Sequence, residues 1–268
     1  MNSPRGFGIM LAFVIIIFIE PVRVWITGDP INESYWYILL GFGFLLAIVI
    51  IRFIIQAVRR NRARERNEEL DGMPPPADNS GDLRYQEPID MMHDHPVQIY
   101  NASGERVATY KYTFRTAFEK WSSLSGFMDF RDIEIKDTDT GDVLLFQARP
   151  LYKNFFRPKW DVYLNGEKHG FFEVARMSIK QVQKEMLFNY HTHGQKYQVV
   201  SPRLSTSSTI TTEHATLMEI ERTVFGLTSK GEDGNRGRKH EIKIENDDEL
   251  RFIEKIGMYQ QSMTRVRN

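Results

Sequence analysis

The sequence contains no cysteine among its 268 residues. Without thiols the chain has no disulfide, no thiolate nucleophile, no cysteine-ligated zinc and no site for S-palmitoylation. It also lacks the short motifs of common catalytic sites, because no G-x-S-x-G, no H-E-x-x-H and no Gly-Lys-Ser phosphate loop occurs in it. We therefore predict that the protein is not an enzyme, and we expect neither a catalytic residue nor a cofactor.

The chain has no overall excess of charge, since 35 basic residues balance 35 acidic ones. The distribution is uneven: residues 1–66 contain eight arginines against four acidic residues, so residues 67–268 carry a net charge of −4. Nucleic-acid binding depends on clustered lysine and arginine side chains that neutralise phosphates. A mildly acidic main part of the chain therefore argues against a nucleic-acid partner.

Two apolar runs near the N-terminus have the character of transmembrane helices. The first extends from Phe7 to Ile19 without a charge and continues to about Trp25, and the second extends from Tyr35 to Ile51. A helix needs about 20 apolar residues to span a bilayer. A cleaved signal peptide is the alternative for the first run, but no small-x-small cleavage site follows it. The two runs therefore predict a transmembrane hairpin.

The basic residues around these runs predict their orientation. The connection between the runs, TGDPINES, contains no lysine or arginine, whereas RRNRARER (residues 59–66) follows the second run and Arg5 precedes the first. Cytoplasmic flanks of membrane helices carry the excess of basic residues. We therefore expect a cell-membrane protein with two spans and both termini in the cytoplasm. The basic run is also suited to contact with anionic lipids.

Composition divides the chain into three parts. Residues 1–66 hold the predicted hairpin and its basic juxtamembrane segment. Residues 67–94 are rich in proline, aspartate and glycine, a composition typical of a linker. Residues 95–268 are predicted to form a cytoplasmic domain, mostly antiparallel β, with a helix at its C-terminal end.

The evidence for β structure is a series of strand–turn–strand patterns. Turns with glycine are predicted at Ser103–Gly104, Thr140–Gly141, Asn165–Gly166 and Gly194, and a fifth strand pair flanks the loop KGEDGNRG. Asparagine, aspartate and glycine are the residues that accept a positive φ in tight hairpin turns. Apolar and polar residues alternate on both sides of these turns. Serial hairpins of this kind indicate a β-barrel or a β-sandwich.

The chain ends with a different pattern. Phe252, Ile256, Tyr259 and Met263 follow one another at helical spacing, behind a capping aspartate at Asp247 or Asp248. These residues predict an amphipathic C-terminal helix.

The serial hairpins DTDTGDVLLFQAR and LNGEKHGFFEVARM, the late strands LMEIERTVFG and HEIKIEN, and the final DDELRFIEKIGMYQQSM together resemble one known family. It is the tubby C-terminal-like domain family, with its LURP-one-related and phospholipid scramblase branches. The resemblance covers roughly residues 97–265. It implies a closed antiparallel barrel around a central hydrophobic helix, and a protein that binds lipids or acts at membranes. The charges of Glu249, Arg251, Glu254 and Lys255 leave open whether the barrel closes around this particular helix.

Basic residues occur beside aromatic ones in the stretch Tyr152–Trp160, and a second basic group follows the late glycine-rich loop. Aromatic side chains can enter the membrane interface while neighbouring cations meet lipid headgroups. The candidate lipid-binding residues are Lys153, Arg157, Lys159, Arg236, Arg238 and Lys239. The alternative is that the aromatic residues belong to the core and the basic residues merely face solvent.

A metal site is not expected. His191 and His193 are two residues apart on a predicted strand, so both are expected on one face, but no third ligand accompanies them.

Taken together, the sequence favours a membrane-tethered, non-enzymatic module that binds anionic lipid, or a protein partner, at the cytoplasmic face. The main alternative is a protein-interaction accessory, such as an immunity or assembly factor, whose partner is a membrane or cytoplasmic protein. A scramblase-like role follows from the family resemblance alone.

Overall fold

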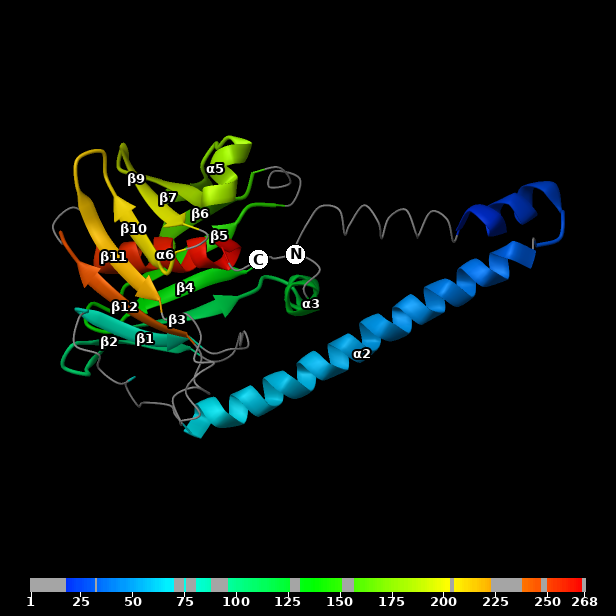
Figure 1. Cartoon of the computed structure of the whole chain (residues 1–268), viewed down its shortest axis with the longest axis horizontal. Coiled ribbons are helices and arrows are strands. Elements are labelled where there is room, and N and C mark those ends of the chain that lie inside the picture. Colours follow the sequence, from blue (N-terminus) through cyan, green and yellow to red (C-terminus); the bar gives the residue numbers. More distant parts are fainter. Residues whose placement is uncertain are drawn as a thin grey trace.

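The computed structural model describes residues 18–31, 33–69, 75, 81–87, 96–125, 131–150, 157–202, 205–222, 238–246 and 250–266. A long N-terminal helix extends away from a β-barrel (Figure 1).

The described residues contain twelve strands that form one closed barrel, in which each strand pairs antiparallel with the next and β12 closes onto β1. The predicted antiparallel β domain is thus confirmed, and of the two alternatives it is a barrel. The strands are β1 (Leu83–Glu87), β2 (Val97–Asn101), β3 (Arg106–Thr113), β4 (Asp132–Asp137), β5 (Val143–Ala148), β6 (Lys159–Leu164), β7 (Glu167–Val174), β8 (Glu185–Thr192), β9 (Gln195–Pro202), β10 (Ser207–Thr211), β11 (Thr216–Arg222) and β12 (Arg238–Ile244).

The predicted hairpin turns lie where the glycines indicated. Between β6 and β7, Asn165 has a φ of 52° and Gly166 a φ of 85°. Two successive residues with positive φ are typical of the tight turn whose twist matches that of the flanking strands. Gly141, between β4 and β5, has a φ of 75°. Local turn chemistry therefore sets the register of these hairpins.

The predicted linker at residues 67–94 needs correction at both ends. The helix α2 (Glu33–Glu69) runs into it, and β1 lies inside it. β1 pairs with β12 on one side and β2 on the other, and it places Leu83 and Tyr85 in the core. β1 has only five residues and lies within a proline-rich stretch, so its alternation of buried and partly exposed side chains gives little local signal for a strand. Its partner β12 lies more than 150 residues further along the chain. Two short helices, α3 (Ala117–Ser125) and α5 (Ile179–Lys184), were also not predicted.

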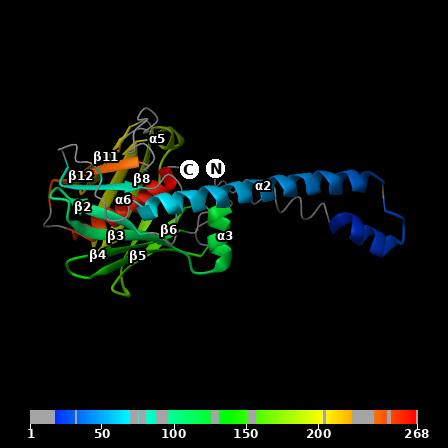
Figure 2. The ribbon, with the colours of Figure 1, turned by 90° about the horizontal axis from the view of Figure 1, so that it is seen from below.

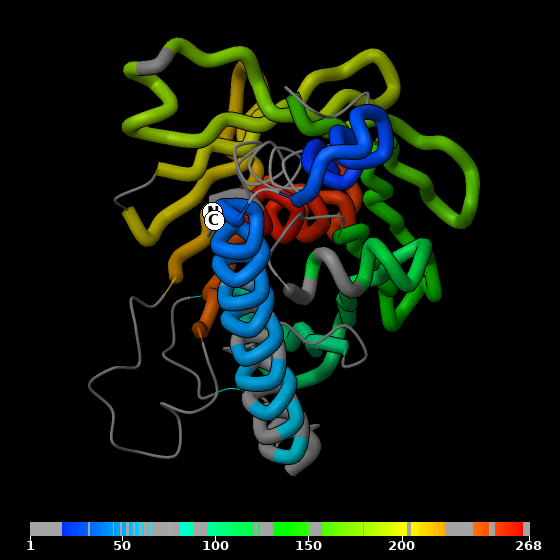
Figure 3. The backbone as a smooth tube through the Cα atoms, turned by 90° about the vertical axis from the view of Figure 1, so that its right-hand side faces the viewer, coloured from blue at the N-terminus to red at the C-terminus, as the bar shows by residue number. Residues whose placement is uncertain are grey.

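The C-terminal helix α6 (Phe252–Val266) lies inside the barrel. Figures 2 and 3 show this helix, in red, surrounded by the strands. Every residue from Ile253 to Thr264 is buried, so the barrel does close around the helix despite its charges. The fit is tight at Gly257, where a Cβ atom would lie only 2.3 Å from Cε2 of Phe146.

Polar partners on the barrel wall explain how charged residues of α6 can be buried. The Glu254 carboxylate accepts a hydrogen bond from the Tyr190 hydroxyl at 2.6 Å and lies 3.0 Å from Nε2 of His169. Burial, reinforced by the negative charge of Glu254, raises the pKa of Tyr190, so this hydroxyl stays protonated and keeps donating. The Lys255 ammonium group donates to the Asn246 carbonyl at 2.6 Å.

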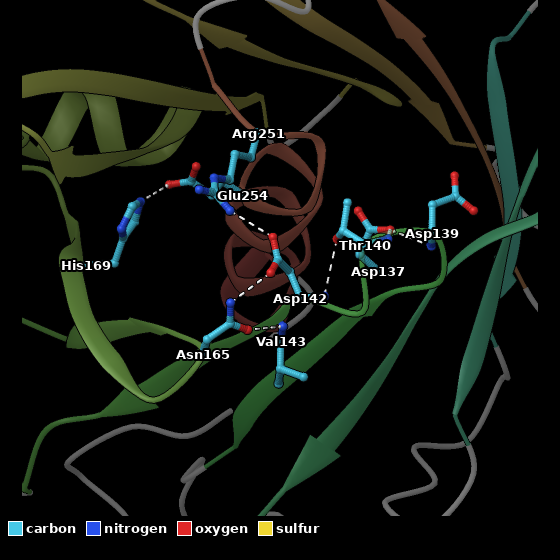
Figure 4. Close-up of polar contacts among 9 residues, drawn as sticks. All are labelled: Asp137, Asp139, Thr140, Asp142, Val143, Asn165, His169, Arg251 and Glu254. Atoms are coloured by element: carbon cyan, nitrogen blue, oxygen red, sulfur yellow. Dashed lines mark hydrogen bonds and ion pairs between the residues drawn. The ribbon is translucent and has the colours of Figure 1, made fainter.

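Arg251, just before α6, is exposed and joins the helix to a neighbouring turn (Figure 4). Its Nη1 donates to Oδ2 of Asp142 at 2.8 Å, while Oδ1 of Asp142 accepts from the Asn165 amide at 2.7 Å. The amide oxygen of Asn165 in turn accepts from the backbone N–H of Val143. Two hairpin turns and the beginning of α6 are therefore held together by one chain of polar contacts.

Before the barrel, residues 18–27 form a short helix, followed by the 37-residue α2. Large apolar side chains of α2 are exposed, among them Trp36 at 60 % and Tyr37 at 79 %. Within the described residues, no helix combines the length and the apolar character that a membrane crossing requires. The two-span hairpin therefore stays a prediction.

Among the described residues, the barrel alone supplies the hydrophobic core cluster. Every residue of the hydrophobic core cluster lies between Leu83 and Met263, and none comes from α2. The strand pairing is also closed, so no edge strand needs a partner from the N-terminal part. We therefore expect residues 71–268 to fold without the N-terminal helices.

A truncation pair tests this domain boundary. Residues 71–268 should unfold cooperatively on heating, whereas residues 91–268 should not, because removal of β1 opens the barrel and takes Leu83 and Tyr85 out of the core. Loss of two large buried side chains costs about 5 kcal/mol or more, comparable with the whole stability of a domain. Circular dichroism melting of both fragments measures this. Equal melting temperatures would show that β1 is not part of the folded unit.

Candidate functional site

One row of outward-facing side chains crosses five neighbouring strands. The registers place the residues of the row directly opposite one another. Their chain neighbours, such as Trp160, Phe172 and Tyr190, face the core, and side chains alternate between the two faces of a strand. The row consists of Gln147 on β5, Asp161 on β6, Phe171 on β7, His191 on β8 and Lys196 on β9.

A second row lies beside the first, two residues away on each strand. Lys159 on β6 is opposite Glu173 on β7, and its Nζ lies 2.6 Å from Oε2 of that carboxylate. Arg157 pairs with the same carboxylate, and its Nε donates to the Val174 carbonyl at 2.7 Å. Glu173 therefore holds two cations in fixed positions at the edge of the first row.

The two rows are joined by Arg149. Its guanidinium group forms a two-pronged contact with Asp161, with Nη2 at 2.8 Å from Oδ1 and Nε at 3.2 Å from Oδ2. Lys168 approaches Asp161 from β7, with Nζ at 3.0 Å from Oδ1. Burial alone would raise the pKa of Asp161, but the hydrogen bonds and positive charges of Arg149 and Lys168 outweigh it and lower the pKa. Asp161 is therefore ionised and orients two cations.

Phe171 lies between these cations on the outer surface. The His191 ring stacks on it, with ring centroids 4.4 Å apart and planes at 15°. The Arg149 guanidinium carbon and the Lys159 ammonium nitrogen lie 5.8 Å and 5.9 Å from the centre of its ring, within the range of cation–π attraction. Phe171 is thus an aromatic platform between positively charged groups.

We refer to this surface as the Phe171 patch. It contains five cationic side chains against two carboxylates, so it is positively charged even with its histidine neutral. It is able to attract an anion with several donors around an apolar centre. The patch comprises Arg149, Arg157, Lys159, Asp161, Lys168, Phe171, Glu173, His191 and Lys196.

The structure divides the candidate residues predicted from the sequence. Arg157 and Lys159 belong to the Phe171 patch, but Arg238 and Lys239 lie on β12, five strands away from β7 around the barrel. Lys239 is buried, and its Nζ lies 2.8 Å from Oε1 of Glu241. These two groups therefore do not form one site. Lys153 and Arg236 lie outside the described residues.

The aromatic residues of the stretch Tyr152–Trp160 are represented in the described residues by Trp160 alone. It is only 2 % exposed and belongs to the core cluster. For this residue the alternative interpretation is confirmed, because the aromatic side chain faces the core and its basic neighbour Lys159 faces outward. The aromatic group that does lie among the cations is Phe171, which sequence reasoning missed.

The two histidines weighed as metal ligands do not share a face. His191 lies on the outer surface of β8, whereas His193 is in the turn with a φ of 49° and contacts the His169 ring edge-on. In the part of the chain that the structure describes, no group of three or more metal-ligating side chains occurs.

The described residues thus form a closed antiparallel barrel of twelve strands around the helix α6, with a basic and aromatic patch on its outer surface. The family model of the Tubby C-terminal like domain matches residues 83–264. The chain therefore belongs to the tubby C-terminal-like domain family, and the match includes β1. No curated protein and no solved structure gave a significant match to the chain.

Two adjacent phenylalanines on β7 test which side chain faces the core and which faces outward. Phe172→Ala should destabilise residues 71–268 by about 3–5 kcal/mol, because Phe172 is fully buried against Phe188 and Trp160. Phe171→Ala should cost about 1 kcal/mol or less, because its ring lies on the outer surface. Urea unfolding of both variants gives these values. A loss at Phe171 as large as that at Phe172 would mean that Phe171 is a core residue.

Proposed function

We propose that this protein is a non-enzymatic module that binds anionic lipid headgroups through the Phe171 patch, at the cytoplasmic face of a membrane to which its N-terminal segments hold it. Membership of the tubby C-terminal-like family is consistent with this, since the family is one of lipid-binding and protein-binding domains.

The observation that carries the proposal is the arrangement of cations around Phe171. Arginine forms paired hydrogen bonds to phosphate oxygens, and lysine contributes point charges. Arg149 and Lys159 are held by carboxylates on neighbouring strands, so little side-chain freedom is lost when an anion binds. A partly exposed aromatic ring between such groups matches the boundary between lipid headgroups and acyl chains.

The membrane tether is supported by the apolar surface of α2. Leu40 and Phe44 are exposed like Trp36 and Tyr37, and none of them belongs to the barrel core. An exposed apolar surface of this extent is typical of contact with a membrane or a protein. A tether keeps the barrel near the bilayer, so that even a weak headgroup site acts at a high effective concentration.

The proposed topology is a hairpin with both ends in the cytoplasm, and it is tested by reporter fusions. A reporter fused after Gly81 should be active on the cytoplasmic side, and one fused after Ile31 on the opposite side. The reason is that basic residues precede the first apolar run and follow the second, whereas the connection TGDPINES contains none. A non-cytoplasmic signal at Gly81 would contradict this orientation.

Vesicle flotation of residues 71–268 tests the lipid site. The domain should float with vesicles of phosphatidylcholine and phosphatidylglycerol but not with phosphatidylcholine alone. The double variant Lys168→Glu, Lys196→Glu should bind at least about tenfold more weakly, since each basic residue near an anionic surface contributes about 1 kcal/mol. The difference should shrink as salt rises, because exposed charges are screened.

The matched control is Lys136→Glu, Lys243→Glu, which changes the net charge equally on β4 and β12, away from the patch. It should retain most of the wild-type binding. Equal losses in the two double variants would mean that only overall charge matters. If the wild-type domain never floats with anionic vesicles, the lipid proposal fails and a protein partner takes its place.

A further inference from the structure

The Phe171 patch contains one histidine, His191, whose ring stacks on Phe171. Resting on the proposed function, we propose that His191 is a further anion-binding residue, and that the patch holds lipid headgroups more tightly when this imidazole is protonated. The site would then respond to acidification at the membrane surface as well as to lipid charge.

The position of His191 makes it available to a bound anion. Its side chain is 32 % exposed, and its ring stacks on the Phe171 ring from the neighbouring strand. On the other side of His191, Lys196 on β9 is directly opposite it in the strand register. An anion that contacts Lys196 and the cations around Phe171 therefore lies beside the imidazole.

The charged groups that face His191 come from four parts of the barrel. Glu173 on β7 places a carboxylate beside it, with Oε1 at 3.9 Å from Nε2 of His191. Lys196 on β9, Lys159 on β6 and Arg157 before β6 oppose a further positive charge. Burial, partly countered by Glu173 and then reinforced by these three cations, lowers the pKa of His191.

The direction of this shift determines how the site responds to pH. Without a ligand, His191 is neutral at neutral pH and gains a proton only on acidification. A bound phosphate group brings negative charge next to the ring, which favours the protonated form and raises the pKa of His191 again. Proton binding and anion binding therefore support each other, as any two linked equilibria must.

The other described histidines are placed differently. His169 contacts Glu254 inside the barrel, and His240 is fully buried beside Tyr259. His193 and His214 lie in the tight turns after β8 and β10. Among the described histidines, His191 alone belongs to the Phe171 patch, so its contribution can be separated from the rest.

The experiment is flotation of residues 71–268 with phosphatidylcholine and phosphatidylglycerol vesicles at about pH 5.5 and about pH 7.5, on either side of the usual histidine pKa. Phosphatidylglycerol keeps its single phosphodiester charge over this range, so changes in binding come from the protein. Wild-type binding should rise at the lower pH by up to about fivefold, which is the effect of one complete basic charge added at an anionic surface. Melting temperatures at both pH values establish that each variant is folded.

Three variants separate His191 from the other histidines. His191→Gln should bind as the wild type does near pH 7.5 and lose most of the increase near pH 5.5. His191→Lys, charged at both pH values, should bind tightly at both. His214→Gln, in an exposed turn, should keep the wild-type response.

The outcomes distinguish this inference from the proposed function. If the wild type binds no anionic vesicle at either pH, the proposed function itself is wrong. If the wild type binds equally well at both pH values, or if His191→Gln keeps the full increase, the role of His191 is wrong while the lipid site stands.

Discussion

The pairing of β1 with β12 is the contact on which the rest of the barrel depends. It joins the first and last strands and removes both edges of the sheet. Closure fixes the number of strands around α6, and the registers then fix which residues of each strand face inward. Because side chains alternate, a slip of one residue would turn the core outward. The same alternation that buries Phe172 and Tyr190 assembles Phe171 and His191 into one row on the outside.

The interior helix places a second demand on the barrel wall. α6 carries Glu254 and Lys255 into the interior, and a buried charge without a partner is strongly destabilising. The wall supplies Tyr190 and His169 for the carboxylate, and the Asn246 carbonyl accepts from the ammonium group. These contacts fix the depth and rotation of the helix more specifically than apolar packing alone. Apolar packing also constrains the helix, because a side chain at position 257 in place of Gly257 would collide with Phe146.

Much of the barrel could be predicted from the sequence, because most of its hairpins are local. Turns such as Asn165–Gly166 carry their own conformational signal, and alternation on both sides gives the faces. β1 could not be found in this way, since its main partner is far away in the chain. The burial of α6 was implied by the family resemblance but left open by its charges, because the polar partners of Glu254 come from β7 and β8. The Phe171 patch needed the register of five strands, which brings Arg149, Phe171 and Lys196 together although each looks like an ordinary surface residue in the sequence.

The position of the patch on the side of the barrel can be reconciled with a tether at the N-terminus. α2 ends at Glu69 and the described chain of the barrel begins at Gly81, so eleven residues connect the helix to the barrel, with only residue 75 described among them. At about 3.5 Å per residue they reach at most about 40 Å. The longest strands have eight residues, which corresponds to about 27 Å at 3.4 Å per residue. The connection is therefore long enough for the proposed arrangement, in which the barrel lies on its side against a membrane with β6, β7 and β8 toward the lipid while the proposed N-terminal tether stays in place. A tether shorter than the barrel would restrict contact to the loops at one end, and the cations around Phe171 would then have no access to headgroups.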